Sequence, residues 1–320
     1  MMAEDGKARP KHMSSRLVIG GAQLGASYGI ANTTGAPTRE KLLQILALAC
    51  AADVGWIDTA RAYAGSEAAI GDALTEFGRW QPFIVTKVVP LQAYEGNDPK
   101  VIGMRVRESL AGSRQSLRRS RLDVVLLHRW QDLRRGHGVV SDILQTEVAS
   151  GQVGTVGASI QSPEELIEAL NTEWVGHVQV PFNILDHRWD AVIPAIRRAR
   201  ARRSLLVHVR SVLLQGLLLS TNLAHWRAAH VTDATGVIGW LHDRMRDCNR
   251  RSVHDLCFSW ARAQDWIDGL VVGVETPEQM AENLKELTTP PLSDEAIDAI
   301  GATRPHLALE SLNPALWIRG

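Results

Sequence analysis

Four polar residues of types that move protons each follow an apolar stretch in the first half of the chain. Asp58 ends one such stretch and Tyr63 follows five positions later, while Lys87 and His128 each come at the end of another. Carboxylates, ammonium groups, phenols and imidazoles are the groups that enzymes use for acid–base chemistry. Because Asp58, Lys87 and His128 each end an apolar run typical of a buried strand, the pattern predicts that these three sit at strand ends and act together with Tyr63 in proton transfer.

The chemistry of these four residues depends on how they pair. Lysine is rare in this chain, with six against 29 arginines, and a buried ammonium needs a carboxylate because desolvation would otherwise drive off its proton. Asp58 is the expected partner of Lys87. An ammonium beside Tyr63 would stabilise the phenolate and make the phenol a better acid toward a carbonyl, and His128 could orient the substrate oxygen. Taken singly, the ion pair could be structural, and Tyr63 or His128 could be core residues.

A regular alternation of apolar runs and helical patterns must position this tetrad. Strands are expected at residues 16–21, at a run ending at Asp58, and at 83–87, 122–128, 155–159, 178–183, 205–212 and 269–274. Each is followed by a helical pattern, the longest at about residues 232–264. Eight such units over about 300 residues predict a single-domain (β/α)8 TIM barrel of the α/β class, whose strand ends form one mouth. Asp58, Lys87 and His128 would then converge.

Composition limits the class of protein and its partners. The 320 residues are 45% hydrophobic, enough for one large core, and 35 basic residues balance 35 acidic ones, so no net field attracts nucleic acid or a membrane. The arginine-rich stretch 197–203 is expected to be a solvated helix face. Residues 1–15 are expected to be a flexible tail before a barrel over 16–320. Three cysteines without a CxxC pattern favour a reducing compartment, the cytoplasm.

Several other chemistries lack their motifs. The glycines after the first expected strand do not lead into a helix at the last glycine, so a Rossmann fingerprint is excluded. Neither HxH nor HExxH occurs, and no metal is expected in the site. The absence of Gly-x-Ser-x-Gly removes the support for a hydrolase of that type.

The four residues together resemble the catalytic tetrad of the aldo-keto reductase family. The blocks Asp-Thr-Ala-Arg-Ala-Tyr ending at Tyr63, Thr-Lys ending at Lys87 and Leu-His ending at His128 have the family's order and spacing, and the resemblance runs from about residue 16 to 287. It implies reduction of an aldehyde or ketone to an alcohol with NAD(P)H. Tyr63 would donate the proton, Lys87 would tune it, Asp58 would hold Lys87, and His128 would position the carbonyl. No side chain supplies hydride, so the reaction needs a cofactor.

The resemblance also assigns a cofactor site. Its residues would be Gly21, Ala22, Gln23, Asp58, Ser159, Gln179, Arg210, Ser211, Leu213, Gly216, Gly273, Glu275, Gln279 and Asn283. Within this set, Ser159 and Gln179 would hold the carboxamide, residues 211–216 would wrap the pyrophosphate, and Asn283 would contact the adenine. Arg210 occupies the place where the family often stacks an aromatic ring on the nicotinamide, and a planar guanidinium could stack there instead.

The adenosine end departs from the family. The Lys, Ser and Arg that often clamp the 2′-phosphate of NADPH are Gly273, Val274 and Gln279 in this chain. The family favours NADPH, while NADH is the alternative, with Glu275 accepting a hydrogen bond from a ribose hydroxyl.

The substrate is the least determined part. Tyr28, Arg129, Trp130 and Asn183 are the candidates for the substrate pocket, and their polarity favours a sugar or another polar metabolite. Two other functions stay open: a cofactor-binding regulatory subunit without significant turnover, as the potassium-channel β subunits of the family illustrate, and a dehydrogenase that works in the oxidative direction. The oligomeric state is left open.

Overall fold

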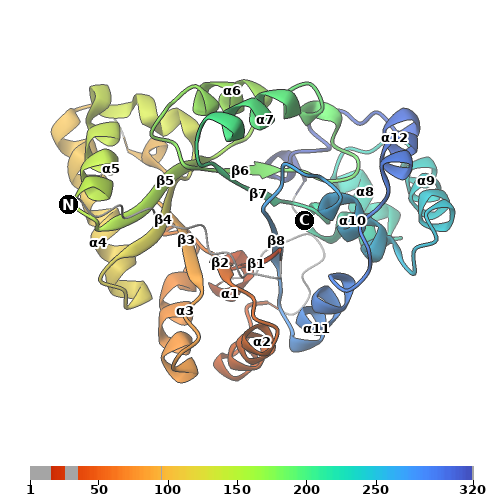
Figure 1. The fold of residues 1–320 in the computed structure, drawn as a ribbon, viewed down its shortest axis with the longest axis horizontal. Helices are drawn as coiled ribbons and strands as arrows, with labels where there is room; N and C mark the ends of the chain where they lie inside the picture. The colour runs from red at the N-terminus through yellow and green to blue at the C-terminus, as the bar shows by residue number, and fades with distance from the viewer. Residues whose placement is uncertain (1–15, 26–34, 95, 319–320) are drawn as a thin grey trace, which may run out of the picture.

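Eight parallel strands close into a barrel in the order of the chain (Figure 1). The structure is a computed structural model that describes residues 16–25, 35–94 and 96–318. The strands are β1 (Leu17–Gly20), β2 (Trp56–Asp58), β3 (Phe83–Lys87), β4 (Leu122–Leu127), β5 (Val153–Ser159), β6 (His177–Pro181), β7 (Leu206–Arg210) and β8 (Gly269–Gly273). The pairing of β1 with β8 closes the ring. The predicted single-domain (β/α)8 barrel is confirmed, and the expected tail at 1–15 lies outside the described residues.

Helices follow the strands and surround the barrel, with α4 and α5 on one side of Figure 1 and α9 and α12 on the other. The helices are α1 (Ala22–Gly25), α2 (Arg39–Ala51), α3 (Ser66–Leu74), α4 (Pro99–Leu117), α5 (Val139–Ala149), α6 (Pro163–Leu170), α7 (Ile193–Arg202), α8 (Leu223–Ala228), α9 (Ala234–Asp247), α10 (Val253–Arg262), α11 (Pro277–Glu286) and α12 (Asp294–Thr303). Their starts follow local chemistry, since the Thr38 and Ser162 side chains accept from backbone amides of the first turns of α2 and α6. No helix in the described ranges is both long and apolar enough to cross a membrane.

The helical region expected at 232–264 is two helices, α9 and α10, which corrects the sequence-based expectation. The break follows Cys248, where Asn249 takes a left-handed conformation with φ 51°. Asparagine tolerates that conformation better than most residues, and it ends a helix. Ser252 then starts α10 by accepting a hydrogen bond from the backbone N–H of Asp255.

The core is divided by the barrel wall. The larger part lies between the strands and the helices, and a small apolar cluster of Val85, Val124 and Leu126, with Trp56 packed against it, lies inside the barrel. This division follows from strand geometry, because alternate residues of each strand point to opposite faces. The inward-facing residue after Trp56 on its strand is Asp58, so the apolar interior gives way to a polar layer at the carboxyl ends of the strands.

The arginine-rich helix α7 is tied to neighbouring segments. Arg197 pairs with Asp265 at 2.8 Å and Arg200 with Asp268 at 2.9 Å. These local ion pairs account for part of the positive charge that the sequence concentrates there.

Candidate functional site

The ammonium of Lys87 and the carboxylate of Asp58 form a buried ion pair at the ends of β3 and β2. Lys87 Nζ donates to Asp58 Oδ1 at 2.7 Å and Oδ2 at 2.8 Å, and to the carbonyl oxygen of Thr59 at 2.9 Å. Both side chains are buried, with Lys87 1% and Asp58 3% exposed. Burial alone would lower the pKa of Lys87, but the neighbouring negative charge and hydrogen bond of Asp58 raise it above its ordinary value. The ammonium is therefore held protonated and fixed in direction.

Tyr63 and His128 lie against this ion pair. The Nζ atom of Lys87 is 5.0 Å from the centroid of the Tyr63 ring. The Tyr63 and His128 rings meet edge to face, with their centroids 5.8 Å apart and an interplanar angle of 86°. The structure thus brings together all four residues of the predicted tetrad, although their roles in catalysis stay predictions.

The electrostatics of the mouth keep His128 neutral. Burial, followed by the positive charges of Lys87, Arg129 and Arg210, lowers the pKa of His128 to about 3. A neutral imidazole has one N–H donor and one acceptor nitrogen. His128 can therefore donate a hydrogen bond to a substrate oxygen at physiological pH without carrying charge.

Gln179 links the tetrad to the second half of the barrel. Its Nε2 donates to Asp58 Oδ2 at 2.6 Å, while its Oε1 is buried and has no hydrogen-bond partner within the described part of the chain. Ser159 lies next to it in register on β5 and is 4% exposed. An open acceptor beside a serine fits the carboxamide of a nicotinamide, so these residues suit the cofactor that the sequence predicted. The contact between Gln179 and Asp58 was not expected from the sequence.

The segment after β7 has the backbone of a loop that wraps a ligand. Ser211, Leu214 and Gln215 have positive φ values of 63°, 47° and 54°, and Gly216 has φ 85°. The loop is closed by backbone hydrogen bonds from Leu214 to Ser211 and from Gly216 to Leu213. Non-glycine residues rarely adopt such conformations, and their clustering is typical of functional segments. The predicted role of residues 211–216 at the pyrophosphate stays a prediction.

Arg210 ends β7 next to that loop. Its Nη2 donates to the carbonyl oxygen of Ile160 at 3.3 Å, which directs the guanidinium toward the end of β5. Its charge contributes to the lowered pKa of His128, so it lies close to the tetrad. Its predicted role at the nicotinamide stays a prediction.

The predicted cofactor residues after β1 and after β8 have close contacts with the protein itself. Gly21 N donates to the carbonyl oxygen of Asp58 at 2.6 Å. A Cβ on Gly273 would overlap the amide of Gln23, so these two predicted cofactor residues pack against each other. Ala22 is half-buried in α1, and Asn283 on α11 is buried.

Gln279 does not project toward a ligand. Its Oε1 accepts from the backbone N–H of Glu275 at 2.8 Å, and its own N–H donates to Thr276 Oγ1. Val274 is 1% exposed, and Gly273 has no side chain. The three positions that commonly clamp a 2′-phosphate therefore present neither a cation nor an exposed hydroxyl.

The candidates for the substrate pocket are dispersed. Arg129 is exposed, whereas Asn183 is buried and its Oδ1 accepts from the backbone N–H of Leu185. Trp130 is 4% exposed and belongs to the core between barrel and helices, since its Nε1 finds a partner in Glu168 Oε2 at 2.7 Å. The expected role of Trp130 as a wall of the substrate pocket stays a prediction. Tyr28 lies outside the described residues.

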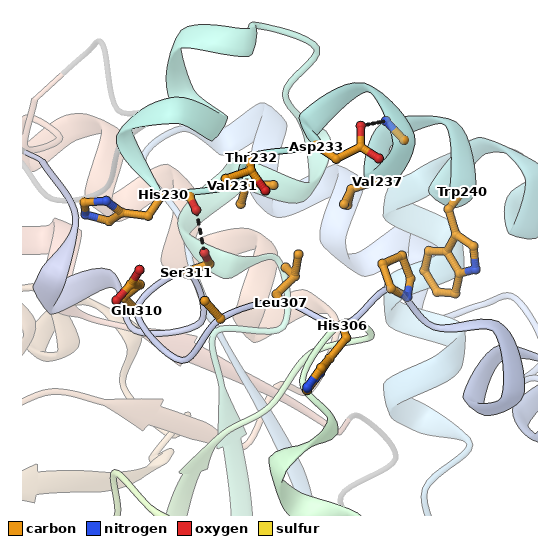
Figure 2. A pocket seen from close by; sticks show the side chains of 13 residues that line it. His230, Val231, Thr232, Asp233, Val237, Trp240, His306, Leu307, Glu310 and Ser311 are labelled. Atoms are coloured by element: carbon orange, nitrogen blue, oxygen red, sulfur yellow. Dashed lines mark hydrogen bonds between the residues drawn. The ribbon is translucent and has the colours of Figure 1, made fainter.

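A separate cavity of about 440 Å³ lies between the start of α9 and the C-terminal segment (Figure 2). His230, Asp233, Trp240, His306 and Ser311 are among its lining residues, and Ser311 Oγ donates to the carbonyl oxygen of His230 at 3.1 Å. None of the tetrad or of the predicted cofactor residues lines it. The C-terminal Trp317 is buried and donates to Ser311 O, so the tail packs beside α8 and α9.

Sequence reasoning missed two groups of buried polar residues near the tetrad. Glu67 on α3 is 3% exposed, and its spacing from Ile70 and Leu74 is the i, i+3, i+7 pattern of a buried helix face, a signal that could have found it. His177 and His208 stand inside the barrel, two residues before Gln179 and Arg210 on the same strands. The period of two that places Gln179 inside the barrel also places His177 there.

The comparisons with known proteins agree on one family. The model of the Aldo/keto reductase family matches residues 16–304. The chain is 25% identical over 261 residues to the NADH-specific methylglyoxal reductase of Escherichia coli, covering 73% of this chain and 78% of that protein. It is 29% identical over 213 residues to aldo-keto reductase ausK of Emericella nidulans, covering 61% of this chain and 52% of that one.

Comparison with solved structures shows similarity of the fold. An aldo-keto reductase of Bacillus halodurans in its holo form superposes with a TM-score of 0.71 at 21% identity, covering 91% of this chain and 93% of that one. At that identity the match speaks for the barrel alone.

Proposed function

The chain belongs to the aldo/keto reductase family, and on this premise we propose that it reduces an aldehyde or ketone to an alcohol with a nicotinamide cofactor, with Tyr63 as the proton donor. The observation that carries the proposal is the buried ammonium of Lys87, which both oxygens of Asp58 hold within 2.8 Å and which lies 5.0 Å from the centroid of the Tyr63 ring. An ammonium fixed beside a phenol stabilises the phenolate that proton donation leaves.

Each residue of the tetrad has a distinct task in the proposed reaction. His128, which is neutral, donates an N–H to the carbonyl oxygen and orients it toward the phenol. Tyr63 transfers its proton to that oxygen as negative charge develops there, and Lys87 stabilises the phenolate. Asp58 keeps the ammonium in place. When bound, the nicotinamide supplies the hydride, held at its carboxamide by Gln179 and Ser159.

NADH is the cofactor that the adenosine end fits better, although the family as a whole favours NADPH. The side-chain oxygen of Gln279 accepts a hydrogen bond from the nearby backbone of Glu275, and neither Gly273 nor Val274 offers a cation to a 2′-phosphate. One relative is named as an NADH-specific methylglyoxal reductase, which supports the same choice. We expect a KM for NADPH no lower than that for NADH, since the missing charge-assisted contact would contribute about 1.5–3 kcal/mol, or at least ~10-fold, to the binding of NADPH.

The cofactor choice has a direct test. Gln279→Arg adds a cation at the commonest clamp position and is expected to improve kcat/KM with NADPH several-fold, with little change for NADH. A strong preference of the wild type for NADPH would contradict this part of the proposal. Glu278→Gln on the same turn is the matched control, because it raises the net charge by the same one unit one position away without adding a cation.

A small polar carbonyl compound is the proposed substrate, with methylglyoxal as the first to test because of the named relative. Sugars and other polar metabolites are the wider class, since the exposed Arg129 stands next to His128 at the mouth. We place the reaction in the cytoplasm, because all three cysteines, Cys50, Cys248 and Cys257, are free thiols. No nucleic-acid or membrane partner forms part of the proposal.

Turnover decides between this proposal and its alternatives. NADH and NADPH oxidation is followed with methylglyoxal and a panel of aldoses, ketones and aromatic aldehydes, and the reverse reaction with the corresponding alcohols. Carbonyl-dependent oxidation of cofactor supports the reductase, and faster turnover with alcohols supports a dehydrogenase. Tight cofactor binding without turnover on any substrate would favour a regulatory subunit.

A further inference from the structure

Two adjoining residues at the start of α3, Ser66 and Glu67, are polar yet almost completely buried, at 0% and 3% exposed. They belong neither to the tetrad nor to the predicted cofactor site. Burying a carboxylate and a hydroxyl costs free energy unless hydrogen bonds compensate for the lost water. The hydrogen-bond partners of Ser66 and Glu67 therefore show which segments the start of α3 holds together.

Ser66 joins the ends of β1 and β2. Its Oγ donates to the carbonyl oxygen of Gly21 at 2.7 Å and lies 2.8 Å from Thr59 Oγ1. Because a hydroxyl has a single proton, Thr59 must be the donor in the second contact. Thr59 directly follows Asp58. The approach is so close that a Cβ on Gly21 would lie 2.6 Å from the carbonyl oxygen of Asp58 and 2.9 Å from Ser66 Oγ, which requires glycine there.

Glu67 joins the loop that carries Tyr63 to β3. Its Oε1 accepts from Thr86 Oγ1 at 2.7 Å, and its Oε2 accepts from Arg61 Nη1 at 3.0 Å. Thr86 directly precedes Lys87. Arg61 lies between Asp58 and Tyr63, and its backbone N–H donates to the carbonyl oxygen of Lys87 at 3.1 Å.

We propose that Ser66 and Glu67 are positioning residues that fix the distance and angle between Tyr63 and the Lys87–Asp58 pair. The proposal rests on the proposed role of Tyr63 as the proton donor. Thr86 and Lys87 point to opposite faces of β3, so Glu67 holds the strand from the helix side while Lys87 reaches the barrel interior. Asp58, Lys87 and Tyr63 thus each have a residue within two positions along the chain whose side chain is bonded to Ser66 or to Glu67. A shift of about 1 Å in such a site can cost roughly 100-fold in rate.

A pair of substitutions at Thr86 separates positioning from stability. Thr86→Val keeps the size of the side chain but removes the donor to Glu67, whereas Thr86→Ser keeps the donor and removes a methyl group from a 1% exposed position. Both lower the free energy of unfolding. We expect kcat to fall at least ~10-fold in Thr86→Val and to stay within about twofold of wild type in Thr86→Ser, with the Kd for cofactor unchanged in both.

A second variant avoids the buried position. Arg61→Met removes the ion pair with Glu67 from the partly exposed side of the contact, with an expected fall in kcat of about threefold to tenfold. Asp72→Asn, at an exposed ion pair farther along α3, is the control and should leave kcat unchanged.

Crystal structures of the two Thr86 variants give a readout that needs no turnover. Displacement of the Tyr63 ring relative to Lys87 Nζ in Thr86→Val, and none in Thr86→Ser, is the expected result. The proposal is overturned if Thr86→Val keeps both the wild-type kcat and the wild-type position of Tyr63, or if the losses of kcat in both variants follow their losses of Tm. If wild type turns over but Tyr63→Phe keeps its activity, the proton-donor role fails instead, and the crystal structures still decide the geometry.

Discussion

The two halves of the barrel treat their buried polar groups differently. In β1–β4, the Lys87 ammonium donates directly to the Asp58 carboxylate, and the Glu67 carboxylate accepts from Thr86 and Arg61, at distances of 2.7–3.0 Å. In β5–β7, buried atoms that could bond are left without partners among the described residues: Gln179 Oε1, both ring nitrogens of His177, and His208 Nδ1. Apart from His128 Nδ1, which is also buried without a partner among the described residues, the polar groups at the ends of β1–β4 are saturated with hydrogen bonds, whereas the second half has several open donors and acceptors.

This contrast separates two requirements of catalysis. Groups that handle a proton must be in place before the substrate arrives, because reorganising them during the reaction would add to the barrier. Groups that bind a ligand must leave donors and acceptors free for it. Each such buried atom lowers the stability of the protein while the ligand is absent. Asp58 belongs to both halves, since it accepts from Lys87 on one side and from Gln179 on the other.

The largest effect is expected where the saturated half is broken. Lys87→Met removes the ammonium and leaves Asp58 buried without its counter-charge, which should lower the free energy of unfolding by about 3 kcal/mol and kcat by at least ~10³-fold. Urea unfolding and steady-state kinetics measure the two effects. Lys100→Met, at an exposed lysine on α4, should change neither. An unaltered kcat in Lys87→Met would contradict the claim that the hydrogen-bonded groups of β1–β4 handle the proton.

A second effect concerns the histidines inside the barrel. Burial lowers the pKa of His208 to about 3, and that of His177 lies well below its ordinary value because of burial and the charge of His208. The unfolded chain therefore binds more protons than the folded one below pH 6.5. Stability is fully present above that pH and is lost as the pH falls toward 3, by about 1.4 kcal/mol per pH unit for each such histidine.

Removing one of these histidines should flatten the acid dependence. His208→Leu is expected to reduce the slope of unfolding free energy against pH between 6 and 4 by about one proton, as measured by urea unfolding at each pH. His242→Gln on α9 is the comparison variant. A slope in His208→Leu equal to that of wild type would mean that the buried pair is not neutral in the folded state.

The smallest effect is expected at the junction of the two halves. Gln179→Leu removes the open acceptor for the carboxamide and one bond to Asp58, and we expect the Kd for NADH to rise about tenfold, with a smaller fall in kcat. Fluorescence titration of NADH gives the first value, and steady-state kinetics gives the second. If only kcat fell, Gln179 would act through its bond to Asp58 and not through binding of the cofactor.

The sequence predicted the saturated half better than the open one. Apolar runs that stop at a polar residue placed Asp58, Lys87 and His128 at strand ends, because such a stop is a local signal. Glu67 escaped notice although its spacing from Ile70 and Leu74 indicates a buried helix face, because its bond to Thr86 joins a helix and a strand whose relative position the spacing does not give. The hydrogen bond between Trp130 and Glu168 joins segments 38 residues apart, which spacing does not encode, and the local bond of Gln279 to the backbone of Glu275 depends on a side-chain conformation that the sequence pattern does not give.

The central claim is that Tyr63 donates the proton from a site that is already assembled. Its most direct test is Tyr63→Phe, which removes the hydroxyl and keeps the ring against Lys87 and His128. With a carbonyl that the wild type reduces, kcat should fall by at least ~10³-fold while the Kd for NADH stays within about twofold, because only the proton donor is lost. A variant that reduces the same carbonyl within tenfold of the wild-type rate would contradict the account.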